Sequence, residues 1–229
     1  MTLAMRRPPG SRPVWTKICG LTSVEDARAV ASFRPDAIGL NFSPLSKRHV
    51  TIDTAREIAA VLPKPVEIVG VFVNHSADEI LAIAEAVGLD AIQLHGDETP
   101  ELARKLSLHP VIRAMRVGED GLAPVADELA SYAANGITLQ ACLVDAHVAG
   151  TYGGTGKTAP WELLREWPDE WPPMILAGGL TPDNVSDAVR LVRPFGVDVA
   201  SGVESRPGVK DLKKVERFLE QSRSVLRGR

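Results

Sequence analysis

The sequence has few cysteines, few aromatic residues and no cluster of charge of one sign. Cys19 and Cys142 are its only cysteines, and aromatic side chains make up 5% of its 229 residues. Two cysteines in apolar segments, without a secretion signal, predict reduced thiols in a cytoplasmic protein. The formal net charge is −3, and no run of Lys or Arg indicates a surface for nucleic acid. We therefore expect no nucleic-acid partner.

The sequence also lacks a long apolar run of the kind that anchors a protein in a membrane. Its first 13 residues are basic and rich in proline, but no apolar segment follows them, so they match neither a signal peptide nor an anchor. We expect a flexible tail over 1–13, with Met1 or Met5 as the true start, and one domain over 14–229. Hydrophobic residues make up 45% of the chain, which is typical of a globular protein with a buried core.

Short apolar segments rich in β-branched residues recur along the chain, with amphipathic helical patterns between them. The expected strands cover 14–19, 37–42, 66–73, 91–95, 111–117, 141–146, 173–179 and 196–201. Helical patterns, several of them opened by Ser, Thr or Asp, include 23–33, 54–62, 77–88 and 212–220. Eight strand–helix units predict a single-domain α/β protein, a closed (β/α)8 TIM barrel. The alternative is an open doubly wound sheet, which usually has fewer strands and a glycine-rich turn after the first.

Polar residues interrupt several predicted strands near their C-terminal ends, which is where barrels carry functional groups. Side chains alternate along a strand, so Gln93 and His95 share one face, while Ile92 and Leu94 point toward the helices. The other polar residues expected at the same end of the barrel are Lys17 and Cys19, Asp145, and Asp198.

Each of these residues, taken alone, also has a purely structural explanation. Free cysteines are usually small buried apolar residues, an aspartate after a strand can cap a helix, and a single histidine is usually a hydrogen-bonded part of the structure. Their occurrence at one end of several strands favours a functional site. The histidines and cysteines lack the spacing of metal ligands, so we expect no metal site.

The segment AGTYGGTGKT at 149–158 looks like the phosphate-binding loop of an ATPase. In that motif the first glycine stands five residues before the Gly-Lys pair, a place that Thr151 occupies here, one position after Gly150. The register therefore excludes the ATPase interpretation. We interpret 146–159 as a long glycine-rich loop that closes over the site as a lid, with a plain surface loop as the alternative.

Two other glycine segments follow the seventh and eighth predicted strands. One contains Gly178 and Gly179, and the other contains Ser201 and Gly202. In many barrels these two loops bind a phosphate through backbone N–H groups, which glycine allows the ligand to approach closely. The pair predicts a small phosphorylated molecule as the partner.

Together, these motifs resemble the phosphoribosylanthranilate isomerase family of tryptophan biosynthesis. The resemblance runs from about residue 15 to residue 220 and includes KICGLTSVEDA, GLNFSPLSKRHV, VGVFVN, IQLHGDE, LVDAHVAGTYGGTGKTAPW, ILAGGLTPDNV and GVDVASGVESRPGVKD. It implies an isomerase that converts N-(5-phosphoribosyl)anthranilate to 1-(2-carboxyphenylamino)-1-deoxyribulose 5-phosphate by an Amadori rearrangement, without a cofactor.

The resemblance also implies roles for individual residues. Cys19 is the expected general base, Asp145 the expected general acid, and Arg48 the expected partner of the anthranilate carboxylate. The remaining expected contacts are Gln93, His95 and Asp198 for the substrate, and Gly178, Gly179, Ser201 and Gly202 for its phosphate. The chain departs from the family at His49, where a tyrosine is more usual.

The chemistry needs one acid and one base. The acid must hold a proton near neutral pH, which a neighbouring carboxylate such as Asp198, or burial, would favour. The base must be a thiolate, whereas a free cysteine is only a few per cent ionised at pH 7. We therefore expect Lys17, which shares a face with Cys19, to lower the pKa of the thiol.

Two alternative functions are also compatible with a barrel of this kind. The isomerase of the histidine pathway runs the same rearrangement on a substrate with two phosphates, but it has an aspartate in place of Cys19 and a half-barrel repeat that is not visible here. A non-catalytic barrel that binds sugar phosphates would have no use for a thiol facing a carboxyl group. The sequence leaves monomer and homodimer open.

Overall fold

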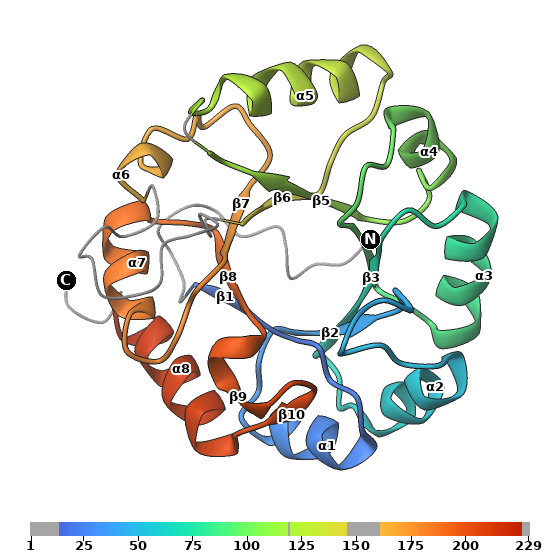
Figure 1. Cartoon of the computed structure of the whole chain (residues 1–229), viewed down its shortest axis with the longest axis vertical. Coiled ribbons are helices and arrows are strands. Elements are labelled where there is room, and N and C mark those ends of the chain that lie inside the picture. Colours follow the sequence, from blue (N-terminus) through green and yellow to red (C-terminus); the bar gives the residue numbers. More distant parts are fainter. Residues whose placement is uncertain (1–13, 119, 146–160, 226–229) are drawn as a thin grey trace.

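The computed structural model describes residues 14–118, 120–145 and 161–225. Eight parallel strands form one closed barrel in chain order, and β8 pairs with β1. Helices form a ring around the strands (Figure 1). The predicted (β/α)8 TIM barrel is therefore confirmed, and the open sheet is excluded because β8 closes onto β1. The predicted tail over 1–13 and the predicted lid over 146–159 lie outside the described residues.

The barrel strands are short, as expected for this fold. They are β1 (Trp15–Cys19), β2 (Ala37–Asn41), β3 (Glu67–Phe72), β4 (Ala91–Leu94), β5 (Val111–Arg116), β6 (Ala141–Asp145), β7 (Met174–Ala177) and β8 (Gly196–Val199). All eight were predicted from the sequence. The largest differences are at the ends of β7 and β8, because the chain turns away from the sheet at the glycines that follow.

Several helices begin at side chains that the sequence offers as caps. The helices are α1 (Val24–Ser32), α2 (Ile52–Val61), α3 (Ala77–Val87), α4 (Pro100–Lys105), α5 (Ala123–Ala134), α6 (Trp161–Leu164), α7 (Val185–Val192) and α8 (Leu212–Ser224). Ser23 caps α1, and Thr51 caps α2, which therefore begins before the predicted position. Ser76 and Glu79 form a reciprocal capping box at the start of α3.

After β8 the chain forms a small substructure that the sequence analysis did not predict. It consists of the 3₁₀ helix η1 (Ser201–Val203) and the antiparallel strands β9 (Glu204–Arg206) and β10 (Val209–Lys210). In Figure 1 the two strands lie between α8 and α1, and the backbone N–H of Lys210 donates to Asp26 of α1. This substructure is therefore joined to the first helix as well as to the last strand of the barrel.

Apolar side chains fill two separate layers. Inside the barrel they are Trp15, Ala37, Val69, Ala91, Ile112, Ala141, Leu143, Ile175 and Ala177. The larger layer lies between barrel and helices and includes Ile92 and Leu94, which confirms the predicted alternation along β4. No helix in the described part of the chain is both long and apolar enough to cross a bilayer.

Candidate active site

A buried ion pair lies inside the barrel just below its mouth, the end where the strands terminate. Lys17 of β1 stands beside Asp198 of β8 in the sheet, and its Nζ donates to Oδ1 of Asp198 at 3.0 Å. The lysine side chain is 0% exposed and that of the aspartate is 10% exposed. A buried charge is costly unless an opposite charge lies next to it, so each member of this pair stabilises the charge of the other. The negative charge of Asp198 is therefore compensated by Lys17 inside the barrel.

Cys19 ends β1, one inward position above Lys17, and it is buried. A Cβ at Gly39 of β2 would lie 2.6 Å from the sulfur and 3.1 Å from Lys17 Cε, so the missing side chain at 39 makes room for both groups. Burial raises the pKa of the Cys19 thiol, and the positive charges of Lys17 and Lys210 act in the opposite direction. Lys17 thus acts in the expected direction, but the expected net lowering of the thiol pKa is wrong because burial outweighs it.

Gln93 and His95 form a hydrogen-bonded pair in and just after β4. The Gln93 amide nitrogen lies 2.8 Å from Nδ1 of His95. If the amide donates, Nδ1 is the acceptor and a neutral imidazole carries its proton on Nε2. Burial lowers the pKa of His95, which favours the neutral ring. The histidine is then available as a hydrogen-bond donor through Nε2.

Charged groups from several strands act on His95 and so belong to the same mouth. Burial has the largest effect on the pKa of His95. The charge of Lys17 also lowers this pKa, and the charges of Asp198 and Asp145 raise it. Asp145 is half-buried and ends β6, beside Ala177 of β7 in the sheet. The predicted acid, the residues of β1 and β8, and the histidine after β4 therefore face one space.

Arg116 is a mouth residue that the sequence analysis missed. It ends β5, is exposed, and stands beside Asp145 of β6 in the sheet. It has the same inward parity as Ile112, which lies in the barrel interior. Every second residue along 111–117 faces the barrel interior. Counting inward positions, as was done for Gln93, would therefore have identified Arg116 from the sequence.

Arg48 lies in the loop after β2 and is held by Glu204 of β9. Its Nε and Nη2 donate to the two carboxylate oxygens of Glu204, both at 2.7 Å. Hydrogen bonding to Glu204 raises the pKa of Arg48 further above its ordinary value. Gly20, at φ +78°, permits this placement, since a Cβ there would overlap the arginine side chain. Glu204 could not be selected from the sequence because β9 lies outside the repeating strand–helix pattern.

The loop after β7 adopts a glycine-dependent turn. Gly178 and Gly179 have φ values of +85° and +64°, which other residues adopt only with strain. The Asn184 amide donates to the Gly179 carbonyl at 3.0 Å and accepts from the backbone N–H of Thr181 at 2.8 Å. These contacts fix the two glycines at the edge of the mouth.

The loop after β8 packs directly against the loop after β7. A Cβ at Gly202 would overlap the carbonyl oxygen of Leu180, so only glycine allows this approach. Ser201, the first residue of η1, is exposed beside it. The four predicted phosphate contacts therefore come from two adjoining loops, with two of the residues on each loop.

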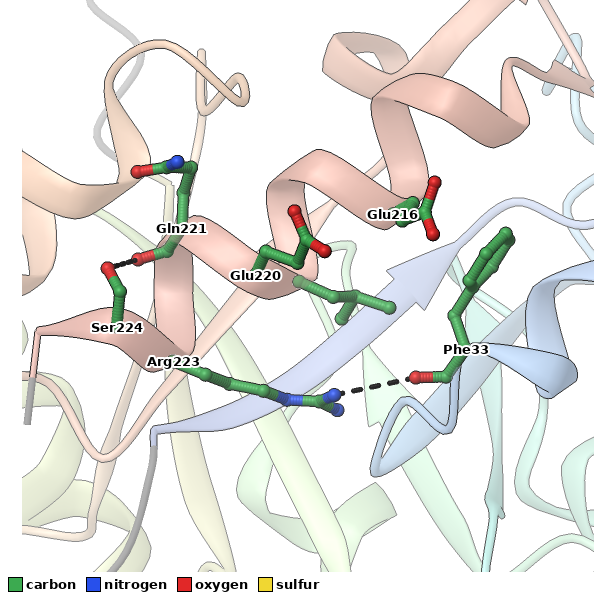
Figure 2. Close-up of a pocket in the computed structure, with 7 residues that line it drawn as sticks. Phe33, Glu216, Glu220, Gln221, Arg223 and Ser224 are labelled. Atoms are coloured by element: carbon green, nitrogen blue, oxygen red, sulfur yellow. Dashed lines mark hydrogen bonds between the residues drawn. The ribbon is translucent and has the colours of Figure 1, made fainter. Parts of the chain in front are cut away.

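A groove of about 520 Å³ lies elsewhere, on the outside of the molecule beside α8. Figure 2 shows Phe33, which follows α1 and precedes β2, with Arg223 of α8 donating to its carbonyl oxygen. This groove is at the end of the barrel where the strands begin, away from Cys19. Across residues 14–118, 120–145 and 161–225, no group of three or more His, Cys, Asp or Glu is placed to hold a metal ion.

Comparison with known proteins decides the family. The sequence model of the N-(5'-phosphoribosyl)anthranilate (PRA) isomerase family matches residues 16–221. The chain belongs to this family. A family member from Stutzerimonas stutzeri (strain A1501), N-(5'-phosphoribosyl)anthranilate isomerase, is 48% identical over 215 residues, which cover 93% of this chain and 99% of the relative. The resemblance found in the sequence motifs is thus confirmed, and the chain is an enzyme.

Solved structures of the family have the same fold. The phosphoribosyl anthranilate isomerase from Thermotoga maritima aligns with a TM-score of 0.81 and 40% identity, covering 92% of this chain and 99% of the other. A second structure is of the isomerase in complex with reduced 1-(o-carboxyphenylamino)-1-deoxyribulose 5-phosphate, at a TM-score of 0.78, 37% identity and the same coverage. Family membership excludes the histidine-pathway isomerase and the non-catalytic barrel as alternatives.

Proposed function

We propose that the chain catalyses the Amadori rearrangement of N-(5-phosphoribosyl)anthranilate to 1-(2-carboxyphenylamino)-1-deoxyribulose 5-phosphate, with Asp145 as general acid and Cys19 as general base. The observation that carries this proposal is the single mouth shared by a thiol from β1, a carboxyl group from β6 and two glycine loops after β7 and β8. A metabolic reaction of this kind, together with two free buried cysteines, also fits the cytoplasm.

In the first step Asp145 donates a proton to the ring oxygen of the ribose. The bond between that oxygen and C1 breaks, and the lone pair of the anthranilate nitrogen forms a C1=N bond, which leaves a protonated imine. The same carboxyl group is then ionised, and its negative charge balances the positive charge of the imine. A group that gives up its proton as the bond breaks lowers the barrier without any metal ion.

In the second step the Cys19 thiolate removes the proton from C2. The electrons of that C–H bond form C1=C2 while the imine nitrogen recovers its lone pair, which gives an enolamine. C1 then takes up a proton and the C2 hydroxyl loses its own, so the ketone forms. Lys17 and Lys210, which lower the pKa of the buried thiol, increase the fraction present as thiolate.

Arg48 suits the anthranilate carboxylate because only part of its planar fork is occupied. Glu204 takes the edge formed by Nε and Nη2, and the edge formed by Nη1 and Nη2 is then the one that faces a second carboxylate. His95 and Gln93 line the same mouth and are proposed to contact the sugar, with Asp198 beside them. The amides of Gly178, Gly179, Ser201 and Gly202 are proposed to bind the phosphate.

The direct test is to add N-(5-phosphoribosyl)anthranilate and follow the loss of its anthranilate fluorescence. The wild-type chain should turn it over, and Cys19→Ala and Asp145→Asn should each lower kcat by roughly 10² to 10⁴-fold, the usual contribution of one acid or base. Cys142→Ala is the matched control because that thiol is buried in the core, and burial raises its pKa to about 12. Near-normal kcat in either site variant would reject the assigned role.

A further inference from the structure

Lys210 is a buried lysine that the acid–base steps do not use directly. It ends β10, and its side chain is 0% exposed. Its Nζ lies 2.6 Å from the carbonyl oxygen of Cys19, 3.0 Å from Oε1 of Glu204 and 3.3 Å from the carbonyl oxygen of Ala200. An ammonium group has three N–H bonds, and these three acceptors match them. The geometry therefore fits the charged form of the lysine.

These contacts connect the base to the carboxylate-binding arginine. On one side Lys210 binds the backbone of Cys19, and on the other it binds Glu204, which holds Arg48 by two hydrogen bonds. We call Arg48, Glu204 and Lys210 the mouth triad. Two cations around one carboxylate leave the mouth triad with one net positive charge, whereas Arg48 and Glu204 alone would be neutral.

All three members of the mouth triad are held in their charged forms by one another. Burial lowers the pKa of Lys210, and the charge of Glu204 opposes this. Burial raises the pKa of Glu204, but its hydrogen bond to Arg48 and the charge of Lys210 bring it below its ordinary value. A buried ion network of this kind gives little net stability compared with apolar packing, so its position beside the site calls for a functional reason.

We propose that Lys210 is a positioning residue of the reaction, which fixes the backbone of Cys19 and, by compensating Glu204, leaves Arg48 with the net positive charge that an aromatic carboxylate requires. The inference rests on the proposed function, because it takes Arg48 as the group that receives the substrate carboxylate. Lys210 itself has no contact with the substrate in this account.

The first test is Lys210→Met, with Lys213→Met as a matched control on an exposed neighbouring lysine. We expect KM for N-(5-phosphoribosyl)anthranilate to rise about tenfold in K210M, as for the loss of one nearby charge, and to stay at the wild-type value in K213M. KM for the N-phenyl analogue, which has no carboxylate, should change little in either. An equal rise in KM for both substrates would overturn the electrostatic role.

The second test is the charge-balanced variant K210M/E204Q. It again leaves Arg48 with one net positive charge, so its KM should return most of the way to the wild-type value. If Lys210 were only structural, removing a second member of the network would make KM worse, and that result would contradict the proposal. Should K210M fail to fold, E204Q and K210M/E204Q can be compared instead, and the double variant should then have the higher KM.

A third measurement does not depend on turnover. Lys17 and Lys210 lower the pKa of Cys19, whereas Asp198 raises it together with burial. The pH dependence of Cys19 alkylation by iodoacetamide should therefore move to higher pH in K210M and not in K213M, and an unchanged profile in K210M would count against the contact with Cys19. If the wild-type chain alkylates as expected but does not turn over the substrate, the proposed function fails and not the effect of Lys210 on the thiol.

Discussion

The thiol of Cys19 depends on a neighbour that has no side chain. Gly39 of β2 stands directly beside Cys19 in the sheet and faces its sulfur. The missing side chain at this position also leaves space for the aliphatic part of the Lys17 side chain. Burial at this position raises the pKa of the thiol, so the site gains a dry environment for proton transfer and needs nearby cations to keep part of the thiol ionised. At the residue scale, the missing side chain at Gly39 leaves the space that the sulfur occupies.

Substituting this glycine gives a prediction at the same scale. In Gly39→Ala the new Cβ would lie 2.6 Å from the sulfur, so Cys19 must move by about 1 Å to restore an ordinary contact. A shift of this size in a reacting group costs roughly 10²-fold, and we expect kcat to fall by about that factor. Gly118→Ala is the control, since no atom of the described residues lies within 4 Å of a Cβ placed there. Wild-type kcat in a folded G39A protein would show that the sulfur position is not critical.

At the scale of elements, the loops after β7 and β8 pack together as one unit because their backbones approach each other closely at one point. Gly202 of η1 lies against the Leu180 carbonyl, and Asn184 fixes the turn at Gly179. Two loops joined in this way hold their backbone N–H groups rigidly, which suits an anion better than flexible side chains do. The small β9–β10 sheet adds Glu204 and Lys210 to the same side of the mouth.

Separating these loops should weaken phosphate binding. A side chain in Gly202→Ala would overlap the Leu180 carbonyl oxygen, which is backbone and cannot rotate away. We expect KM to rise by roughly tenfold or more, because poorly placed donors lose a charge-assisted hydrogen bond each. The measurement is KM together with inhibition by inorganic phosphate, again with Gly118→Ala as control. Unchanged inhibition by phosphate in G202A would place the phosphate site elsewhere.

At the scale of the whole molecule, the sequence predicted the barrel well because its signals are local. Alternation in β4 correctly separated Gln93 from Ile92 and Leu94, and eight strand–helix units correctly predicted closure. The roles of Cys19 and Asp145 came from the family resemblance, and they stay proposals here. The structure adds that both strand ends open on one mouth.

The rest depended on contacts between distant parts of the chain. Lys210 lies 191 positions after Cys19 and Glu204 lies 156 after Arg48, and no periodic pattern connects residues so far apart. The predicted direction of the Cys19 pKa shift was wrong for a similar reason, because burial of the thiol is a property of the folded barrel. Alternation would have found Arg116, had it been applied to the fifth strand.

The central claim is that one substrate lies between Cys19 and Asp145 with its phosphate on the β7 and β8 loops. The most direct measurement is a crystal structure of this chain with reduced 1-(o-carboxyphenylamino)-1-deoxyribulose 5-phosphate. We predict the sugar carbons between the Cys19 sulfur and the Asp145 carboxyl group, the aromatic carboxylate at Arg48, and the phosphate at the amides of Gly179 and Gly202. A ligand bound with its phosphate away from these loops, or with its sugar out of reach of either side chain, would contradict the account.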